Sequence, residues 1–229
     1  PPLLNQPTLV QANPDRAYIA RPEFVAAMFD ARPMPIGHRF DASDGSAWYG
    51  VAMAPGVRLI GLDTTDAARW DAGWVYPFGA MSTRQVRFLK RELSAAADRG
   101  ECVVVASHHP SEAILAAGSV IDGQGLRDLL GSYPNVAVHL VGHGHQNRVH
   151  QRDGYLEIET CSTLDWPGEG RIVELWRDPE TEGVTVSYRM FSPLEMTPPL
   201  NDRLAPMRTE AHCLDRKSTR LNSSHGKLS

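Results

Sequence analysis

Residues 135–145 read NVAVHLVGHGH, a strand-like run that ends in a turn of alternating glycine and histidine. Two imidazoles separated by one residue, just past a strand end, can point into one ligand pocket, and glycine lets the backbone turn sharply there. Imidazole is the commonest metal ligand and suits transition metals such as zinc and iron. The pair His143 and His145 therefore predicts a metal centre at the end of a sheet strand. An exposed polar loop with two histidines is the alternative that this stretch alone leaves open.

A second strand-like run, upstream, delivers further histidines. Cys102–Ala106 is a short continuous apolar run, typical of a strand covered on both faces, and Ser-His-His-Pro at 107–110 follows it. A helix predicted at Gly123–Leu130 separates this strand from the next one, at Val136–Val141, and this order implies a parallel pair with a right-handed crossover. Ligands of open α/β sheets bind outside the carboxyl ends of parallel strands. We therefore expect the histidines that follow the two strands to converge.

The rest of the chain predicts a mixed α/β pattern without an internal repeat or a linker. Ser82 is a typical N-cap residue for a helix that runs through about Ala97. The apolar positions of this helix recur with helical spacing and predict a buried face made of Val86, Leu89, Leu93 and Ala96. The other expected elements are a helix at Pro22–Phe29, a hairpin of strands Trp48–Met53 and Val57–Leu62 around Pro55-Gly56, a loop at Ala67–Ala80, and successive antiparallel strands at Arg148–Gln151, Tyr155–Thr160, Arg171–Trp176 and Val184–Phe191.

The two histidine motifs resemble a known family in their order and context. Val104–Pro110 followed by Val141–His145 is similar to the last two signature motifs of the calcineurin-like metallophosphoesterases. The resemblance covers roughly residues 57–176, because the strand that ends in Leu62-Asp63-Thr64 is also similar to the family. So are the segment Gly79-Ala80-Met81 and the helix with Gln85, Phe88 and Leu89. The resemblance implies an α/β fold, the C-terminal part of a four-layer α/β/β/α sandwich with mixed sheets.

The same resemblance implies a centre of two divalent metal ions, such as manganese, iron or zinc, that acts on a small phosphoester. By motif, His108 and His143 would bind one metal ion and His145 the other. His109 stands where the family varies, and it would either contact the substrate or line the pocket. The implied activity is hydrolysis of a phosphomonoester or a phosphodiester.

The chain departs from the family upstream of these motifs. The family's Asp-x-His, Gly-Asp and Gly-Asn-His motifs, the last with the expected general-acid histidine, do not occur before residue 57, where His38 stands alone. We therefore expect a partial catalytic domain at 1–214 with an insertion-like, loop-rich start at 1–46, inactive without its upstream part. Residues 215–229 have no apolar periodicity and are expected to be an adapter-derived or unstructured tail. A mononuclear metal hydrolase that uses only His108, His143 and His145, and a noncatalytic structural module, are the alternatives.

Composition excludes some partners. The 229 residues are 42% hydrophobic and 22% charged, as in ordinary globular chains, and the formal net charge is −4. No Lys/Arg-rich face is evident, so nucleic acid is not expected as the main partner. No apolar stretch approaches the roughly 20 residues that span a bilayer.

Several other polar residues have ordinary interpretations. His139 alternates with core residues inside a strand and is expected to be structural, while His150 is expected to be solvated. Asp63, at a strand exit, is either a partner of the metal ligands or a loop cap. Ser107 has no acidic partner at the spacing of a catalytic triad, so the sequence does not favour a serine hydrolase. Cys102 and Cys161 lie in apolar runs and are expected to be buried thiols.

Overall fold

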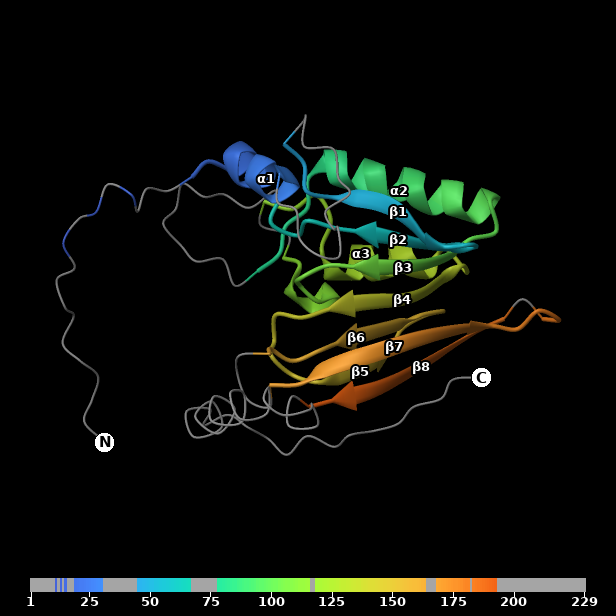
Figure 1. Cartoon of the computed structure of the whole chain (residues 1–229). Coiled ribbons are helices and arrows are strands. Elements are labelled where there is room, and N and C mark those ends of the chain that lie inside the picture. The colour runs from blue at the N-terminus through green and yellow to red at the C-terminus, as the bar shows by residue number, and fades with distance from the viewer. Residues whose placement is uncertain are drawn as a thin grey trace. The chain divides into compact units, whose positions relative to one another are not determined.

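The computed structural model of the chain describes residues 11, 13, 15, 19–30, 45–66, 78–115, 118–163, 168–181 and 183–192 (Figure 1). The chain divides into two compact units, Pro1–Ala47 and Trp48–Ser229. In the first unit, helix α1 spans Arg21–Asp30, which confirms the predicted helix. The predicted tail at 215–229, His38 and most of the insertion-like start lie outside the described residues.

A six-stranded mixed sheet forms the centre of the second unit, with the strand order β1-β2-β3-β4-β6-β5. Strands β2, β3, β4 and β6 run parallel, and β1 and β5 pair antiparallel at the two edges. The strands are β1 Tyr49–Ala54, β2 Val57–Gly61, β3 Cys102–Ala106, β4 Val136–Val141, β5 Arg148–Gln151 and β6 Leu156–Glu159. The predicted hairpin and the parallel pair of β3 and β4 are confirmed.

Strand β6 differs from the prediction of successive antiparallel strands. It pairs antiparallel with β5 as expected, but it lies between β5 and β4 and runs parallel to β4. The chain leaves β4, passes the next position in the sheet to form β5 at the edge, and returns by a hairpin. The returning strand then has the direction of β4, and its carboxyl end reaches the same edge of the sheet as the turn at 142–145.

Two helices cover one face of this sheet. They are α2, Thr83–Asp98, and α3, Gly123–Gly131; a short 3-10 turn, η3, at Ser111–Ala113 precedes α3. Ser82 caps α2 by accepting a hydrogen bond from the backbone N–H of Gln85, as predicted. The buried face of α2 includes Gln85, whereas Val86 is only half-buried. The core on this side contains Ile60, Leu89, Leu93, Val103, Val105, Leu126, Leu130 and Val136.

A two-stranded antiparallel sheet packs on the other face. It consists of β7, Gly170–Arg177, and β8, Val184–Phe191. Its side chains join a second core with Val104, Val138, Leu156 and Ile158. Val104 lies in this core and its neighbours Val103 and Val105 in the other, because successive side chains of a strand point to opposite faces. The predicted α/β class with mixed sheets is confirmed. Among the described helices, none combines the length and the apolar character needed to cross a membrane.

Candidate metal centre

Three polar turns meet at the carboxyl edge of the parallel strands, after β2, β3 and β4. The backbone hydrogen bonds of the sheet continue into them: the N–H of Ser107 donates to the carbonyl of Leu140 at 3.0 Å, and that of Gly142 donates to the carbonyl of His108 at 2.9 Å. These bonds fix the turn at 107–110 against the turn at 142–145. The convergence expected from the strand order is therefore present.

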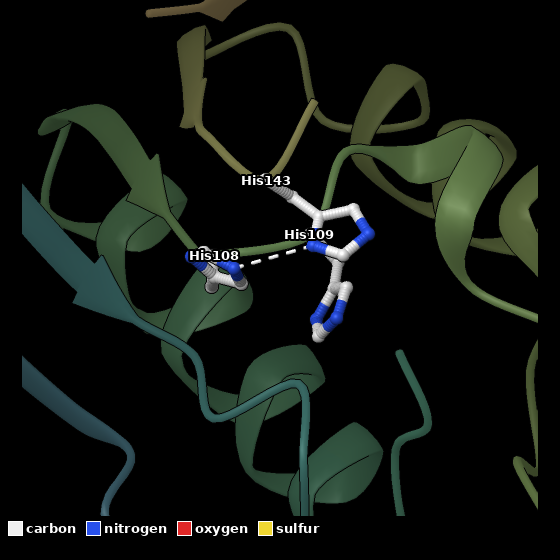
Figure 2. A group of neighbouring side chains, drawn as sticks. All are labelled: His108, His109 and His143. Carbon is white, nitrogen blue, oxygen red and sulfur yellow. Dashed lines mark hydrogen bonds between the residues drawn. The ribbon is translucent and has the colours of Figure 1, made fainter. Parts of the chain in front are cut away.

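Three imidazoles form a compact cluster at this edge: His108, His109 and His143 (Figure 2). One ring nitrogen of each lies within 4.8 Å of the others. Nδ1 of His143 is 3.3 Å from Nε2 of His108, and the ring centroids of His109 and His143 are 4.5 Å apart. Three imidazoles with room for a further ligand are a known donor set for a catalytic zinc ion. Within the described ranges, the cluster contains no carboxylate.

His109 has the partner that a metal ligand needs. Its side chain is 2% exposed, and its Nδ1 lies 2.6 Å from the hydroxyl of Thr64, which follows β2. Metal-binding histidines usually engage their second ring nitrogen in such a hydrogen bond, which fixes the tautomer and the ring orientation. Nε2 of His109 is then the nitrogen left for a metal ion. The family resemblance put this residue at a position where the family varies. In the structure it belongs to the cluster.

The surroundings of His108 and His109 favour the neutral form of these two imidazoles. Burial lowers the pKa of His109 to about 4, with a further contribution from the charges of His143 and His108. The pKa of His108 is also lowered, first by burial and then by His143 and His145. A neutral imidazole is the form that binds metal, so at neutral pH these two rings need not release a proton first. The donor set therefore fits a divalent transition-metal ion.

His145 occupies a different position from the other expected ligands. It is exposed and is not part of the compact group, although its charge is close enough to affect the pKa of His108. The structure therefore brings His108 and His143 together, adds His109, and places His145 beside the cluster.

The turn that carries His143 and His145 has an unexpected backbone conformation. Both histidines adopt positive φ angles, 73° and 53°, whereas Gly142 and Gly144 do not. The expected role of glycine in this turn is therefore only partly right. At Gly144 the constraint is steric, because a Cβ atom at this position would overlap the carboxylate of Glu159.

Glu159 is a residue that the sequence interpretation missed. The segment Leu156-Glu157-Ile158-Glu159 alternates apolar and acidic residues, which suggests one exposed face, yet all four residues are buried. Register pairs Glu159 with Val141, directly before the histidine turn. Burial raises the pKa of Glu159, and its Oε1 atom is buried without a hydrogen-bond partner. Glu159 is buried because β6 lies inside the sheet, between β4 and β5. The sequence did not reveal this position.

Two further expectations are resolved by hydrogen bonds. Asp63 accepts from the N–H and the hydroxyl of Thr65 at 3.0 and 2.6 Å, so it acts as a loop cap. Ser107 was expected to lack an acidic partner at the spacing of a catalytic triad, and the fold links it to a distant acid through a histidine. Its Oγ lies 2.8 Å from Nε2 of His139, whose Nδ1 lies 3.0 Å from Oε2 of Glu157. The acid comes from β6, far from Ser107 in the sequence.

Comparison with known proteins gives distant structural neighbours. No family model and no curated protein matches the chain. A dimetal phosphatase from Danio rerio is 16% identical, with a TM-score of 0.46, over 75% of this chain and 63% of that one. A putative 5'-nucleotidase from Staphylococcus aureus is 17% identical over 69% and 33% of the two chains, with a TM-score of 0.41. The sulfate thiohydrolase SoxB of Thermus thermophilus is 14% identical, with a TM-score of 0.39, over 74% of this chain and 29% of that one. The chain spans less than two thirds of each of these proteins.

Proposed function

We propose that this chain is part of a metal-dependent phosphoric ester hydrolase, a phosphomonoesterase or phosphodiesterase of the calcineurin-like metallophosphoesterase type. One observation carries the proposal: His108, His109 and His143 gather at the carboxyl edge of two adjacent parallel strands. The order of the motifs around them supports the phosphoester class. The substrate would be a small phosphoester bound at this edge of the sheet.

His108 and His143 would hold one metal ion, and His145 would belong to a second ion beside it. His109 adds a third nitrogen to the first position, with Thr64 holding its ring. A divalent ion in such a site supplies Lewis-acid stabilisation of phosphoryl oxygens and lowers the pKa of a bound water. The residues of the chain contribute the imidazole donors and fix the distance between them.

A mononuclear site is the second candidate, and the composition of the cluster favours it. Three imidazoles suffice for one ion. Two adjacent divalent ions would need carboxylates to offset their charge, and the described cluster has none. In this second candidate, the chain of 229 residues would bind a single metal ion weakly and would show no turnover.

Metal titration of the chain with matched variants tests the centre. Co²⁺ and Zn²⁺ are titrated into the wild type, His108→Ala, His143→Ala and the control His150→Ala, whose ring lies on β5 outside the cluster. We expect the two cluster variants to lose at least tenfold in affinity and the control to keep the wild-type value. Equal affinities in all four proteins would refute the centre, and the stoichiometry separates one ion from two.

Phosphate binding tests the substrate class without requiring turnover. Inorganic phosphate and phenyl phosphate are titrated into the metal-loaded and the metal-free chain by calorimetry, with acetate as the control anion. The proposed function predicts that phosphate binds only in the presence of metal and that His143→Ala abolishes this binding. Phosphate affinity that does not depend on the metal would count against a phosphoester hydrolase.

A further inference from the structure

A continuous row of hydrogen bonds runs from the core of the sheet to the backbone of the metal cluster. It begins at Glu157 on β6, passes through His139 on β4 and reaches Ser107 after β3. From Ser107 the hydroxyl donates to the carbonyl oxygen of His109 at 2.9 Å. We call these three side chains the Glu-His-Ser relay. Glu157 and His139 are both 0% exposed, so neither can exchange this partner for water without opening the core.

The relay has a definite arrangement of hydrogens. A serine hydroxyl carries one hydrogen, and here it points to the carbonyl of His109. Ser107 must therefore accept, not donate, at Nε2 of His139. Nδ1 of the same ring must donate to the carboxylate of Glu157, which has no hydrogen to give when ionised. The ring of His139 thus faces Ser107 with Nε2 and Glu157 with Nδ1.

Glu157 is held firmly at the inner end of the relay. Burial alone would raise its pKa, but the hydrogen bond and the charge of His139, together with Arg152, hold the pKa far below its usual range. Arg152 lies 2.7 Å from Oε1, and the hydroxyl and the N–H of Ser111 lie 3.1 and 3.2 Å from the carboxylate. The relay is thus anchored by partners from two other segments, and its inner end cannot move freely.

The same geometry argues against a nucleophilic serine. Serine, histidine and glutamate within hydrogen-bonding distance resemble a catalytic triad, in which the histidine accepts the serine hydrogen. In this chain the hydrogen of Ser107 is directed to a backbone carbonyl, and the ring donates to the serine. His139 is then unable to act as a base toward Ser107. The relay is suited to holding a backbone in place.

We propose that Ser107 is a positioning residue for the metal cluster, and that the relay fixes the backbone of His108 and His109 relative to the sheet. The proposal rests on the metal centre proposed above. Two further bonds complete the frame: the N–H of Gly142 donates to the carbonyl of His108, and Thr64 holds the ring of His109. Without the relay bond, the peptide after His109 gains freedom and the imidazoles no longer face one point. Outer partners of metal ligands typically contribute about 10–100-fold to metal affinity.

Metal affinity of hydroxyl variants tests the proposal. The dissociation constant for Zn²⁺ is measured by competition with a chelating dye in the full chain and in Ser107→Ala, Ser107→Thr and Ser107→Gly. Ser94→Ala is the matched control, since this serine on α2 bonds Tyr133 and is remote from the cluster. We expect a loss of about 10–100-fold in Ser107→Ala, a smaller loss in Ser107→Thr because it keeps the hydroxyl, and no change in the control. If Ser107→Ala does not fold, Ser107→Gly, which also lacks the hydroxyl, must show the loss.

Nitrogen-15 NMR of the His139 ring supplies a readout that does not depend on metal. We expect Nε2 of His139, the nitrogen that faces Ser107, to carry a hydrogen in the metal-free chain. An unprotonated Nε2, or covalent labelling of Ser107 by a fluorophosphonate, would overturn the positioning role in favour of a nucleophile.

The result also separates this role from the metal centre itself. If Ser107→Ala and Ser107→Gly bind Zn²⁺ as tightly as the wild type while His143→Ala does not, the positioning role is wrong and the centre stands. If His143→Ala also binds like the wild type, the centre is wrong and the role of the relay fails with it.

Discussion

At the scale of single residues, the candidate site combines a buried imidazole, His109, with a turn whose backbone conformation is unfavourable. His143 and His145 both lie in the left-handed region. Residues with side chains rarely adopt this conformation, and each instance costs on the order of 1 kcal/mol or more. The surrounding hydrogen bonds hold the turn in this form. The packing of the sheet beneath the turn offsets the cost of this conformation. A costly conformation at both histidines is consistent with a role of their side chains in binding.

His109 should make the stability of the metal-free chain depend on pH. Its pKa is about 4 in the folded chain and near the usual 6.5 when unfolded, so the unfolded state binds the extra proton between these values. The free energy of unfolding should therefore fall as the pH decreases from 6.5 to 4. The shift corresponds to about 3 kcal/mol at its full extent.

Urea unfolding with EDTA present, at pH 4.5, 5.5 and 7.5, measures this effect in the wild type and in His109→Gln. Because the variant cannot gain the proton, we expect its stability to fall less toward acid. The two proteins are compared relative to their values at pH 7.5, where His109 is neutral in both states. Parallel pH curves would show that His109 is not responsible.

The glycines on either side of His143 should respond differently to substitution. A Cβ atom at Gly144 would overlap the buried carboxylate of Glu159, whereas at Gly142 it would make only ordinary contacts. We expect Gly144→Ala to lower the free energy of unfolding by about 1–3 kcal/mol, typical of overpacking. Gly142→Ala should cost clearly less.

A double-mutant cycle identifies the cause. If the clash with Glu159 is responsible, Gly144→Ala should cost much less in a Glu159→Ala background. The same cost in both backgrounds would point to the backbone of the turn instead. Chemical denaturation at pH 7.5 provides all four free energies.

At the scale of elements, helix α2 fixes one wall of the site. Its N-terminus lies beside the turn after β2, where Gln85 accepts from the N–H of Asp63 at 2.7 Å and donates to its carbonyl at 2.8 Å. The same turn carries Thr64, which holds His109. Further along, Glu92 reaches back to Arg58 on β2 with a contact of 2.6 Å between the guanidinium and the carboxylate. The helix is therefore attached to the sheet at both its start and its middle.

Removal of the cap of α2 should weaken the helix measurably. Ser82 accepts from the N–H of Gln85 at 3.2 Å. We expect Ser82→Ala to lower the free energy of unfolding by about 1 kcal/mol, the usual value for loss of an N-cap, and Ser82→Asp to retain most of it. Urea unfolding followed by circular dichroism measures both variants. A cost of Ser82→Asp as large as that of Ser82→Ala would show that capping is not the role of this residue.

At the scale of the whole second unit, two cores share one sheet. Helices α2 and α3 close the first, and β7 and β8 close the second. The parallel strands between them are buried on both faces, which explains the continuous apolar run of β3. The site lies at the edge where these strands end, so both cores support it.

The two cores should contribute independently to stability. Leu93→Ala removes contacts in the first core and should cost about 2–5 kcal/mol, and Ile158→Val in the second should cost about 0.5–1.5 kcal/mol. Because the sheet separates the two positions, we expect the costs to add within about 0.5 kcal/mol in the double variant. Urea denaturation of the four proteins measures the sum. A coupling above about 1 kcal/mol would show that the cores are not independent.

Local pattern accounts for most of the described elements. The cap at Ser82, the hairpin at Pro55-Gly56 and the strand at Val136–Val141 are found at or near their predicted positions. Each depends on interactions between residues close in the sequence, or on the alternation of apolar and polar side chains. The sequence also predicted that the histidines converge, because the carboxyl ends of adjacent parallel strands lie at the same edge of the sheet.

The sequence alone determined the α/β class, the parallel pair of β3 and β4, and the two histidine motifs at its edge. It did not determine that β6 returns beside β4, because strand order depends on contacts between distant residues. Only the tertiary structure therefore placed Glu159 behind the turn, joined Glu157 to His139 and Ser107, and drew His109 into the cluster. Burial and hydrogen bonding of these side chains arise from neighbours up to 46 positions away, which no local pattern encodes.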